Sequence, residues 1–141
     1  MPINENYTAE ETSFFLRDSQ TRLFVTTRKE AESLSESADS YFQIETLENN
    51  GSGTLSSFAD SQKGPTIPKG RNLQDVAALL YTSGTTGRPK AAMITHENLI
   101  SNVETLSEYW RFTAEDILIH ALPVYHTHGL FVATNIILFS E

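Results

Sequence analysis

The sequence contains no cysteine among its 141 residues. This absence excludes a disulfide framework, thiolate metal sites and cysteine nucleophiles in one step. It also fits a reducing compartment. Residues 1–5 show neither a basic start nor an apolar run, so no secretory signal is expected. Together these features predict a cytoplasmic protein.

Long hydrophobic runs and positive charge are scarce as well. The longest apolar stretch, residues 130–139, includes Thr134 and Asn135 and is shorter than the roughly 20 residues that span a bilayer. There are 10 lysines and arginines against 18 aspartates and glutamates, so the net charge is −8. Because an acidic surface repels phosphate backbones and anionic lipid, we expect neither nucleic acid nor a membrane as partner. ATP remains compatible, since it needs only a local positive site.

The elements that the residue pattern predicts form an α/β architecture, in which strands alternate with helices. In the first part, helices are expected at 8–18, 28–37 and 55–61, and strands at 21–27 and 41–47. Thr8 and Glu11 have the spacing of a capping box at the start of the first helix. A loop at 62–72, with its glycines and prolines, separates a peripheral α/β segment (1–61) from a second segment (73–141).

The second segment is more strongly patterned. We expect a buried strand of a mostly parallel sheet at 76–81, a return strand at 91–94, a helix with Thr95 as N-cap, another buried strand at 117–122 and an apolar helix from about 130. The helix after Thr95 has a face that we predict to be core, formed by Leu99, Ile100, Val103, Leu106, Tyr109 and Trp110.

A loop rich in glycine and hydroxyl groups follows the first of these strands. It consists of Thr82, Ser83, Gly84, Thr85, Thr86, Gly87, Arg88, Pro89 and Lys90. Glycine lets a ligand approach the main chain, consecutive backbone N–H groups make an anion nest, and lysine adds a point charge. A mobile surface loop is the plain alternative, but the position directly after a buried strand favours phosphate binding. The spacing of the glycines and Ala91 after the lysine exclude a Walker loop.

A second polar cluster, His126-Thr127-His128-Gly129, follows Pro123. The two histidines either cap the following helix or act as donors in a site. A zinc site would need a third ligand, and none stands out, so no metal site is expected. His96 and His120 are interpreted as structural.

Residues 81–90 resemble the signature loop of the adenylate-forming superfamily, which includes acyl-CoA synthetases, peptide-synthetase adenylation domains and luciferases. Ala91 stands where that loop normally continues with glycine. Residues 108–133, with their His126-Thr127-His128-Gly129 motif, resemble the malonyl-CoA synthetase branch more closely than the long-chain fatty acid branch. The resemblance covers nearly the whole chain and is loose only between 28 and 72.

The resemblance implies part of the large N-terminal AMP-binding domain, a mostly parallel sheet flanked by helices, without the C-terminal lid domain. Residues 1–141 would then be a fragment, inactive on its own, of an ATP-dependent acid–thiol ligase. Such a ligase uses ATP, Mg²⁺ and coenzyme A to form an acyl-adenylate and then an acyl-CoA thioester, here with malonate as the acid. A fatty or aryl acid, or a truncated non-catalytic nucleotide-binding remnant, remains an alternative, and the oligomeric state stays open.

The same resemblance assigns residue roles. ATP phosphates would be bound by Thr82, Ser83, Gly84, Thr85, Thr86, Gly87 and Lys90, and the acid by His126, Thr127, His128 and Gly129. Lys90 and His126 would be catalytic. His126 can donate to the pentavalent phosphorus centre as its charge builds. Thr127 would lie beside the α-carbon of the acid, with His128 and Gly129 shaping the turn.

Overall fold

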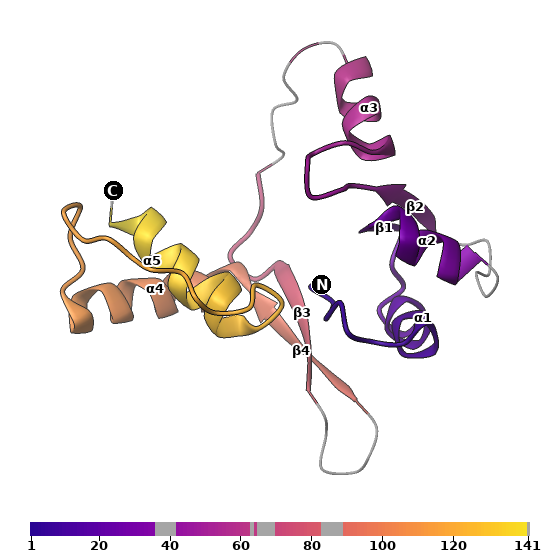
Figure 1. Cartoon of the computed structure of the whole chain (residues 1–141). Helices are drawn as coiled ribbons and strands as arrows, with labels where there is room; N and C mark the ends of the chain where they lie inside the picture. Colours follow the sequence, from indigo (N-terminus) through magenta and orange to yellow (C-terminus); the bar gives the residue numbers. More distant parts are fainter. Residues whose placement is uncertain (36–41, 63, 65–69, 83–88, 141) are drawn as a thin grey trace. The chain divides into compact units, whose positions relative to one another are not determined.

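The computed structural model describes residues 1–35, 42–62, 64, 70–82 and 89–140. The chain divides into two compact units, Glu5–Pro68 and a second unit made of Met1–Asn4 with Lys69–Glu141 (Figure 1). The division falls within the segment 62–72, which the sequence predicts to be a loop. Each unit is described by itself below.

The first unit contains the helices and strands that the sequence predicts. They are α1 (Ala9–Asp18), β1 (Leu23–Thr26), α2 (Arg28–Ser35), β2 (Gln43–Thr46) and α3 (Thr54–Ser61). Strands β1 and β2 pair in parallel, with Leu23 opposite Gln43. The buried side chains Phe15 and Leu16 of α1 and Leu34 of α2 form the core of this unit. The parallel pair and its helices agree with the predicted α/β class.

The predicted capping box at the start of α1 is confirmed. The hydroxyl oxygen of Thr8 accepts a hydrogen bond of 3.2 Å from the backbone N–H of Glu11. The carboxylate of Glu11 in turn accepts one of 2.8 Å from the backbone N–H of Thr8 and one of 2.9 Å from its hydroxyl. The backbone hydrogen bond, followed by the hydroxyl bond, lowers the pKa of the Glu11 carboxyl from its ordinary value.

This lowered pKa predicts how one carboxylate contributes to acid stability. A group whose folded pKa is depressed stabilises the fold above its unfolded pKa, and the contribution is lost as the pH falls through the folded value. Glu11→Gln keeps an acceptor for the capping box but removes the charge. We expect a lower melting temperature than the parent at pH 7 and a difference that shrinks as the pH is lowered into the acid range, followed by circular dichroism. Glu10→Gln, in the same first turn, is the control. A Glu11→Gln difference that does not shrink as the pH is lowered would contradict the assignment.

The second unit contains a two-stranded ribbon followed by helices. Its elements are β3 (Val76–Thr82), β4 (Lys90–Thr95), α4 (His96–Trp110), the π-helix η1 (His128–Ala133) and α5 (Thr134–Phe139). Strands β3 and β4 pair antiparallel from Val76 opposite Thr95 to Thr82 opposite Lys90. The return strand and the Thr95 N-cap are therefore as predicted, and Asn98 completes a capping box with Thr95.

Strand β3 is less buried than predicted. The sequence predicts a buried strand followed by a return strand, and β3 does pair antiparallel with the return strand β4, but Ala78 is its one buried residue. Among the described residues, β3 has a strand partner along one edge only. The apolar side chains of such a ribbon stay accessible unless another layer covers them, and Met93 of β4 is 69% exposed.

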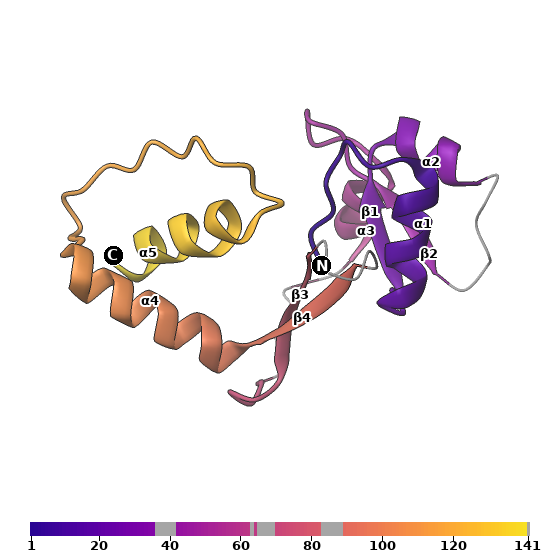
Figure 2. The same ribbon diagram turned by 90° about the horizontal axis from the view of Figure 1, so that it is seen from below.

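The prediction of a strand at 117–122 is wrong for this structure. The described chain forms no strand there, and Ile117 and Ile119 are 93% and 87% exposed. A strand exists only through hydrogen bonds to a neighbouring strand, and no described segment pairs with these residues. Instead, the chain after α4 follows a long arc that leads to η1 (Figure 2).

The predicted core face of α4 is only partly buried. Val103 is buried and Leu99 and Leu106 are half-buried, whereas Tyr109 and Trp110 are exposed. Helix α4 packs mainly against α5, where Ile136 is buried, rather than against the sheet. Figure 2 shows these two helices side by side. No helix in the described ranges combines the length and the hydropathy that crossing a membrane requires.

Candidate functional site

The two ends of the predicted phosphate loop, residues 82–90, are anchored in the β3–β4 ladder. Thr82 ends β3, Lys90 begins β4, and the two residues lie directly opposite each other. Opposed residues of an antiparallel pair have Cα atoms about 5 Å apart and side chains on the same face. Both side chains are exposed. The ladder thus fixes the backbone of Lys90 while its ammonium group can reach a ligand beside Thr82.

The interior of this loop lies outside the described residues. Ser83, Gly84, Thr85, Thr86 and Gly87, with Arg88, belong to that part of the chain. Their predicted contacts with phosphate therefore stay predictions. Of the described loop residues, the hydroxyl of Thr82 lies 3.4 Å from the carbonyl oxygen of Lys90, a long contact across the loop's ends.

The second group of predicted site residues, residues 126–129, forms a compact turn that we call the histidine turn. The backbone N–H of His126 donates to the carbonyl of Pro123 at 3.2 Å, and the carbonyl of His126 accepts from the N–H of Leu130 at 2.9 Å. Gly129 is buried, and a Cβ atom there would lie 2.3 Å from the Pro123 carbonyl oxygen. Only a glycine permits this approach of two backbone segments.

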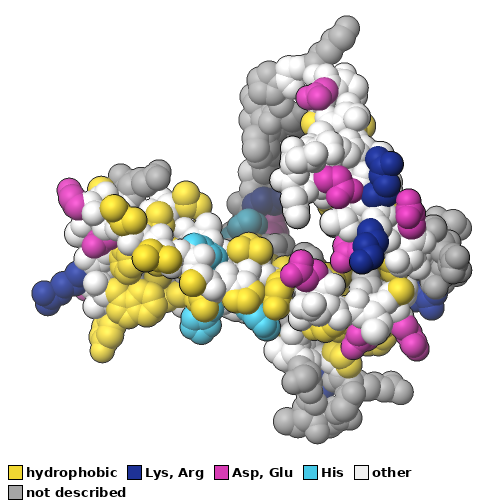
Figure 3. All heavy atoms as spheres, viewed as in Figure 1, with side chains coloured by type: hydrophobic (Ala, Val, Ile, Leu, Met, Phe, Trp, Pro, Cys, Tyr) yellow, Lys and Arg dark blue, Asp and Glu magenta, His cyan; other side chains and the backbone are white. Residues whose placement is uncertain are grey.

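The polar side chains of the histidine turn are exposed. His126, Thr127 and His128 are all accessible, and the ring of His126 lies 4.7 Å from that of Tyr125, centroid to centroid, at 51°. Figure 3 shows histidine side chains at the surface, among hydrophobic side chains, where η1 and α5 lie in Figure 1. Within the described residues, neither His126 nor His128 makes a side-chain hydrogen bond to η1. The helix-capping alternative for these two histidines thus lacks support here.

The histidine turn continues into η1, and a third histidine contacts it. The Nε2 atom of His120 lies 2.8 Å from the carbonyl oxygen of Gly129, which also accepts from the hydroxyl of Thr134 at 3.0 Å. Sequence reasoning left His120 as structural and did not link it to the turn. No local pattern could have found this contact, because it depends on how the chain folds back between positions 120 and 129.

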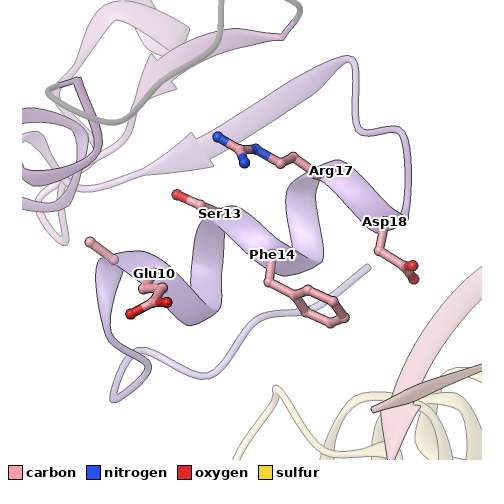
Figure 4. Close-up of a pocket in the computed structure, with 6 residues that line it drawn as sticks. Glu10, Ser13, Phe14, Arg17 and Asp18 are labelled. Carbon is pink, nitrogen blue, oxygen red and sulfur yellow. The ribbon is translucent and has the colours of Figure 1, made fainter. Parts of the chain in front are cut away.

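Other features of the surface do not extend the site. In the described part of the chain, no group of three or more His, Cys, Asp or Glu side chains could hold a metal ion. A hollow along α1 in the first unit is lined by Ala9, Glu10, Ser13, Phe14, Arg17 and Asp18 (Figure 4). None of these residues is a predicted site residue. The candidate site thus consists of the anchored loop ends and the histidine turn, which belong to the same unit.

The chain is similar to known proteins over the residues that form this candidate site. The sequence model described as AMP-binding enzyme matches residues 1–140. The chain belongs to the AMP-binding enzyme family. Three parts of the candidate site lie within the matched residues: Thr82 and Lys90 at the two ends of the loop, and the histidine turn.

Individual relatives are similar over nearly the whole chain. The oxalate–CoA ligase of Arabidopsis thaliana is 37% identical over 137 residues, 92% of this chain and 26% of that protein. The malonate–CoA ligase of the same plant is 33% identical over 139 residues, 94% of this chain and 22% of that protein. The structure of ATP-bound MatB from Rhodopseudomonas palustris has a TM-score of 0.91 and 45% identity, with 99% of this chain and 28% of that chain covered. The family member described here thus spans about a quarter of the length of these relatives.

Proposed function

We propose that this chain supplies the phosphate-binding and acid-binding part of an ATP-dependent ligase that converts malonate into malonyl-CoA. The observation that carries the proposal is the placement of Thr82 opposite Lys90, at the two ends of a loop rich in glycine and hydroxyl groups. The similarity to ATP-bound MatB supports ATP as a substrate. The similarity to a malonate–CoA ligase supports coenzyme A and malonate.

In the first half-reaction, a carboxylate oxygen of malonate attacks the α-phosphorus of ATP in line, and pyrophosphate leaves. Such a phosphoryl-centred reaction depends mainly on positioning and on neutralisation of charge. Lys90, with the hydroxyls and backbone N–H groups of the loop, would bind the β- and γ-phosphates. Mg²⁺ would assist by supplying positive charge that helps to neutralise these phosphates.

The histidine turn would bind the acid during the same step. The exposed ring of His126 can donate a hydrogen bond to the α-phosphate oxygens as negative charge builds on the pentavalent centre. Thr127 would lie beside the α-carbon of malonate, while Gly129 and His128 give the turn its shape. In the second half-reaction the thiol sulfur of coenzyme A attacks the acyl carbonyl carbon, and AMP leaves.

An exchange assay with a panel of acids tests this function. We expect the complete ligase to catalyse malonate-dependent exchange between pyrophosphate and ATP, and to form malonyl-CoA when coenzyme A is added. Octanoate and benzoate are the controls for the fatty-acid and aryl-acid alternatives. Exchange with these acids but not with malonate would overturn the assignment. Nucleotide binding without exchange for any acid would favour a non-catalytic remnant.

Oxalate is the second candidate acid, because the oxalate–CoA ligase of Arabidopsis thaliana is 37% identical to this chain. Oxalate and malonate differ by one methylene group, and such a difference in a binding pocket changes kcat/KM by about tenfold to two-hundredfold. The ratio of kcat/KM for these two acids therefore identifies the preferred substrate. A ratio that favours oxalate by tenfold or more would replace malonate in the proposal.

A further inference from the structure

The carbonyl oxygen of Gly129 is the point where three parts of the second unit meet. It accepts from Nε2 of His120 at 2.8 Å and from the hydroxyl of Thr134 at 3.0 Å. Both contacts are present together in the structure. They join the segment before the histidine turn, the first turn of η1 and the start of α5.

These bonds complete a set of contacts that fixes the histidine turn at both ends. At its start, His126 donates its N–H to the Pro123 carbonyl. At its end, buried Gly129 lies against that same carbonyl. The contact from His120 then holds the carbonyl oxygen of the Gly129 peptide. A shift of this peptide would therefore move the backbone that carries His126 and Thr127.

The geometry also assigns the proton on His120. A carbonyl oxygen only accepts, so at 2.8 Å the Nε2 atom of His120 must carry a hydrogen. The hydroxyl of Thr134 donates its single hydrogen to Gly129, and its contact with Nε2 is longer, 3.5 Å. The Nε2–H form is thus the one that the Gly129 peptide selects.

We propose that His120 is a positioning residue for the acid-binding turn, acting through the carbonyl of Gly129. The inference rests on the proposed function and deepens it by adding a residue that has no direct contact with the acid. Its side chain orders the backbone of residues 126–129, so its loss affects use of the acid more than use of ATP. The phosphate loop is anchored separately, by the β3–β4 ladder.

Two substitutions at position 120 test this inference in the complete ligase. His120→Leu removes the donor, whereas His120→Gln keeps an N–H group at the Nε2 position. We expect His120→Leu to lower kcat/KM for the acid by about tenfold to a hundredfold, mainly through KM for the acid, with KM for ATP unchanged. His120→Gln should recover most of the loss. Thr134→Val, which leaves the His120 bond in place, should show a smaller effect.

Several results would overturn the inference. One is a kcat/KM for the acid that His120→Leu leaves unchanged. Another is an equal rise in KM for the acid and for ATP that His120→Gln does not reverse, which indicates a general loss of structure. Nitrogen-15 NMR gives a readout independent of activity: the inference requires the Nε2–H form of His120, and the Nδ1–H form would exclude it.

The proposed function can fail separately. If the parent ligase activates an acid other than malonate, the kinetic comparison uses that acid. The choice of malonate is then wrong, while rescue by His120→Gln still supports the positioning role. A parent protein that activates no acid would overturn both proposals.

Discussion

Replacing Lys90 with alanine is expected to lower the rate of acyl-adenylate formation by about a hundredfold to a thousandfold, the usual cost of removing one preorganised donor from a site of developing charge. The ammonium group would neutralise the β- and γ-phosphates as pyrophosphate leaves. The fold should be unaffected, because the Lys90 side chain is exposed and alanine preserves its backbone bonds to β3. Such surface substitutions change stability by about 0.5 kcal/mol or less.

The measurement is pyrophosphate–ATP exchange at saturating malonate, together with the melting temperature. Arg71→Ala is the matched control, since it removes one exposed positive charge from the same unit without touching the phosphate loop. Lys90→Arg keeps the charge but changes the donor geometry and should recover part of the rate. Unchanged exchange in Lys90→Ala would remove this lysine from the mechanism.

A second large effect is expected from adding a single methyl group at position 129. The Cβ atom of Gly129→Ala would lie 2.3 Å from the carbonyl oxygen and 2.8 Å from the carbonyl carbon of Pro123. These are backbone atoms that cannot rotate away, so the histidine turn must move. Overpacking of this kind costs about 1–3 kcal/mol, which exceeds the roughly 1 kcal/mol that alanine gains over glycine within a helix. We expect a lower melting temperature and a loss of acid-dependent exchange.

Two further variants separate the causes of this loss. Gly70→Ala is the control for the substitution itself, because a Cβ at Gly70 would meet no atom within 4 Å. It should leave stability and exchange unchanged. His126→Ala removes the proposed donor without displacing the backbone, and should lower the exchange rate at an unchanged melting temperature. A Gly129→Ala protein as stable and active as the parent would show that Pro123 and Gly129 are not in close contact.

Features encoded by neighbouring residues could be predicted from the sequence. Thr8 and Glu11 form their capping box because both partners lie within one helical turn. Thr95 caps α4 for the same reason, and Asn98 supplies the reciprocal bond. The strand β3 and its return strand β4 were also predictable, since they follow each other along the chain.

Features that depend on distant partners could not be predicted in the same way. The apolar pattern at 117–122 predicted a buried strand, but a strand needs a neighbour, and no described segment supplies one. The exposure of Tyr109 and Trp110 has a similar cause, because periodicity gives the face of a helix but not the length over which another element covers it.

The candidate site also combines features that neighbouring residues encode with features that depend on distant partners. Thr82, Lys90 and residues 126–129 were predicted because their motifs are contiguous. The role of the Gly129 carbonyl as a shared acceptor was not, because it requires the chain to fold back over the nine positions that separate it from His120. Backbone acceptors leave no trace in residue type, so such a contact is visible only in three dimensions.

The pairing of Thr82 with Lys90 also restricts where the chain can gain or lose a single residue. Side chains alternate between the two faces of a strand, so a slip of one residue turns every following side chain to the other face. The described pairing of the two strands ends at Thr82 and Lys90. A change in the length of the loop therefore leaves its two anchors on the same face as long as Thr82 and Lys90 stay paired. An unmatched single-residue insertion between Lys90 and Thr95 would turn the lysine away from the face that it shares with Thr82, unless a second bulge like the one between Val76 and Ala78 absorbed it.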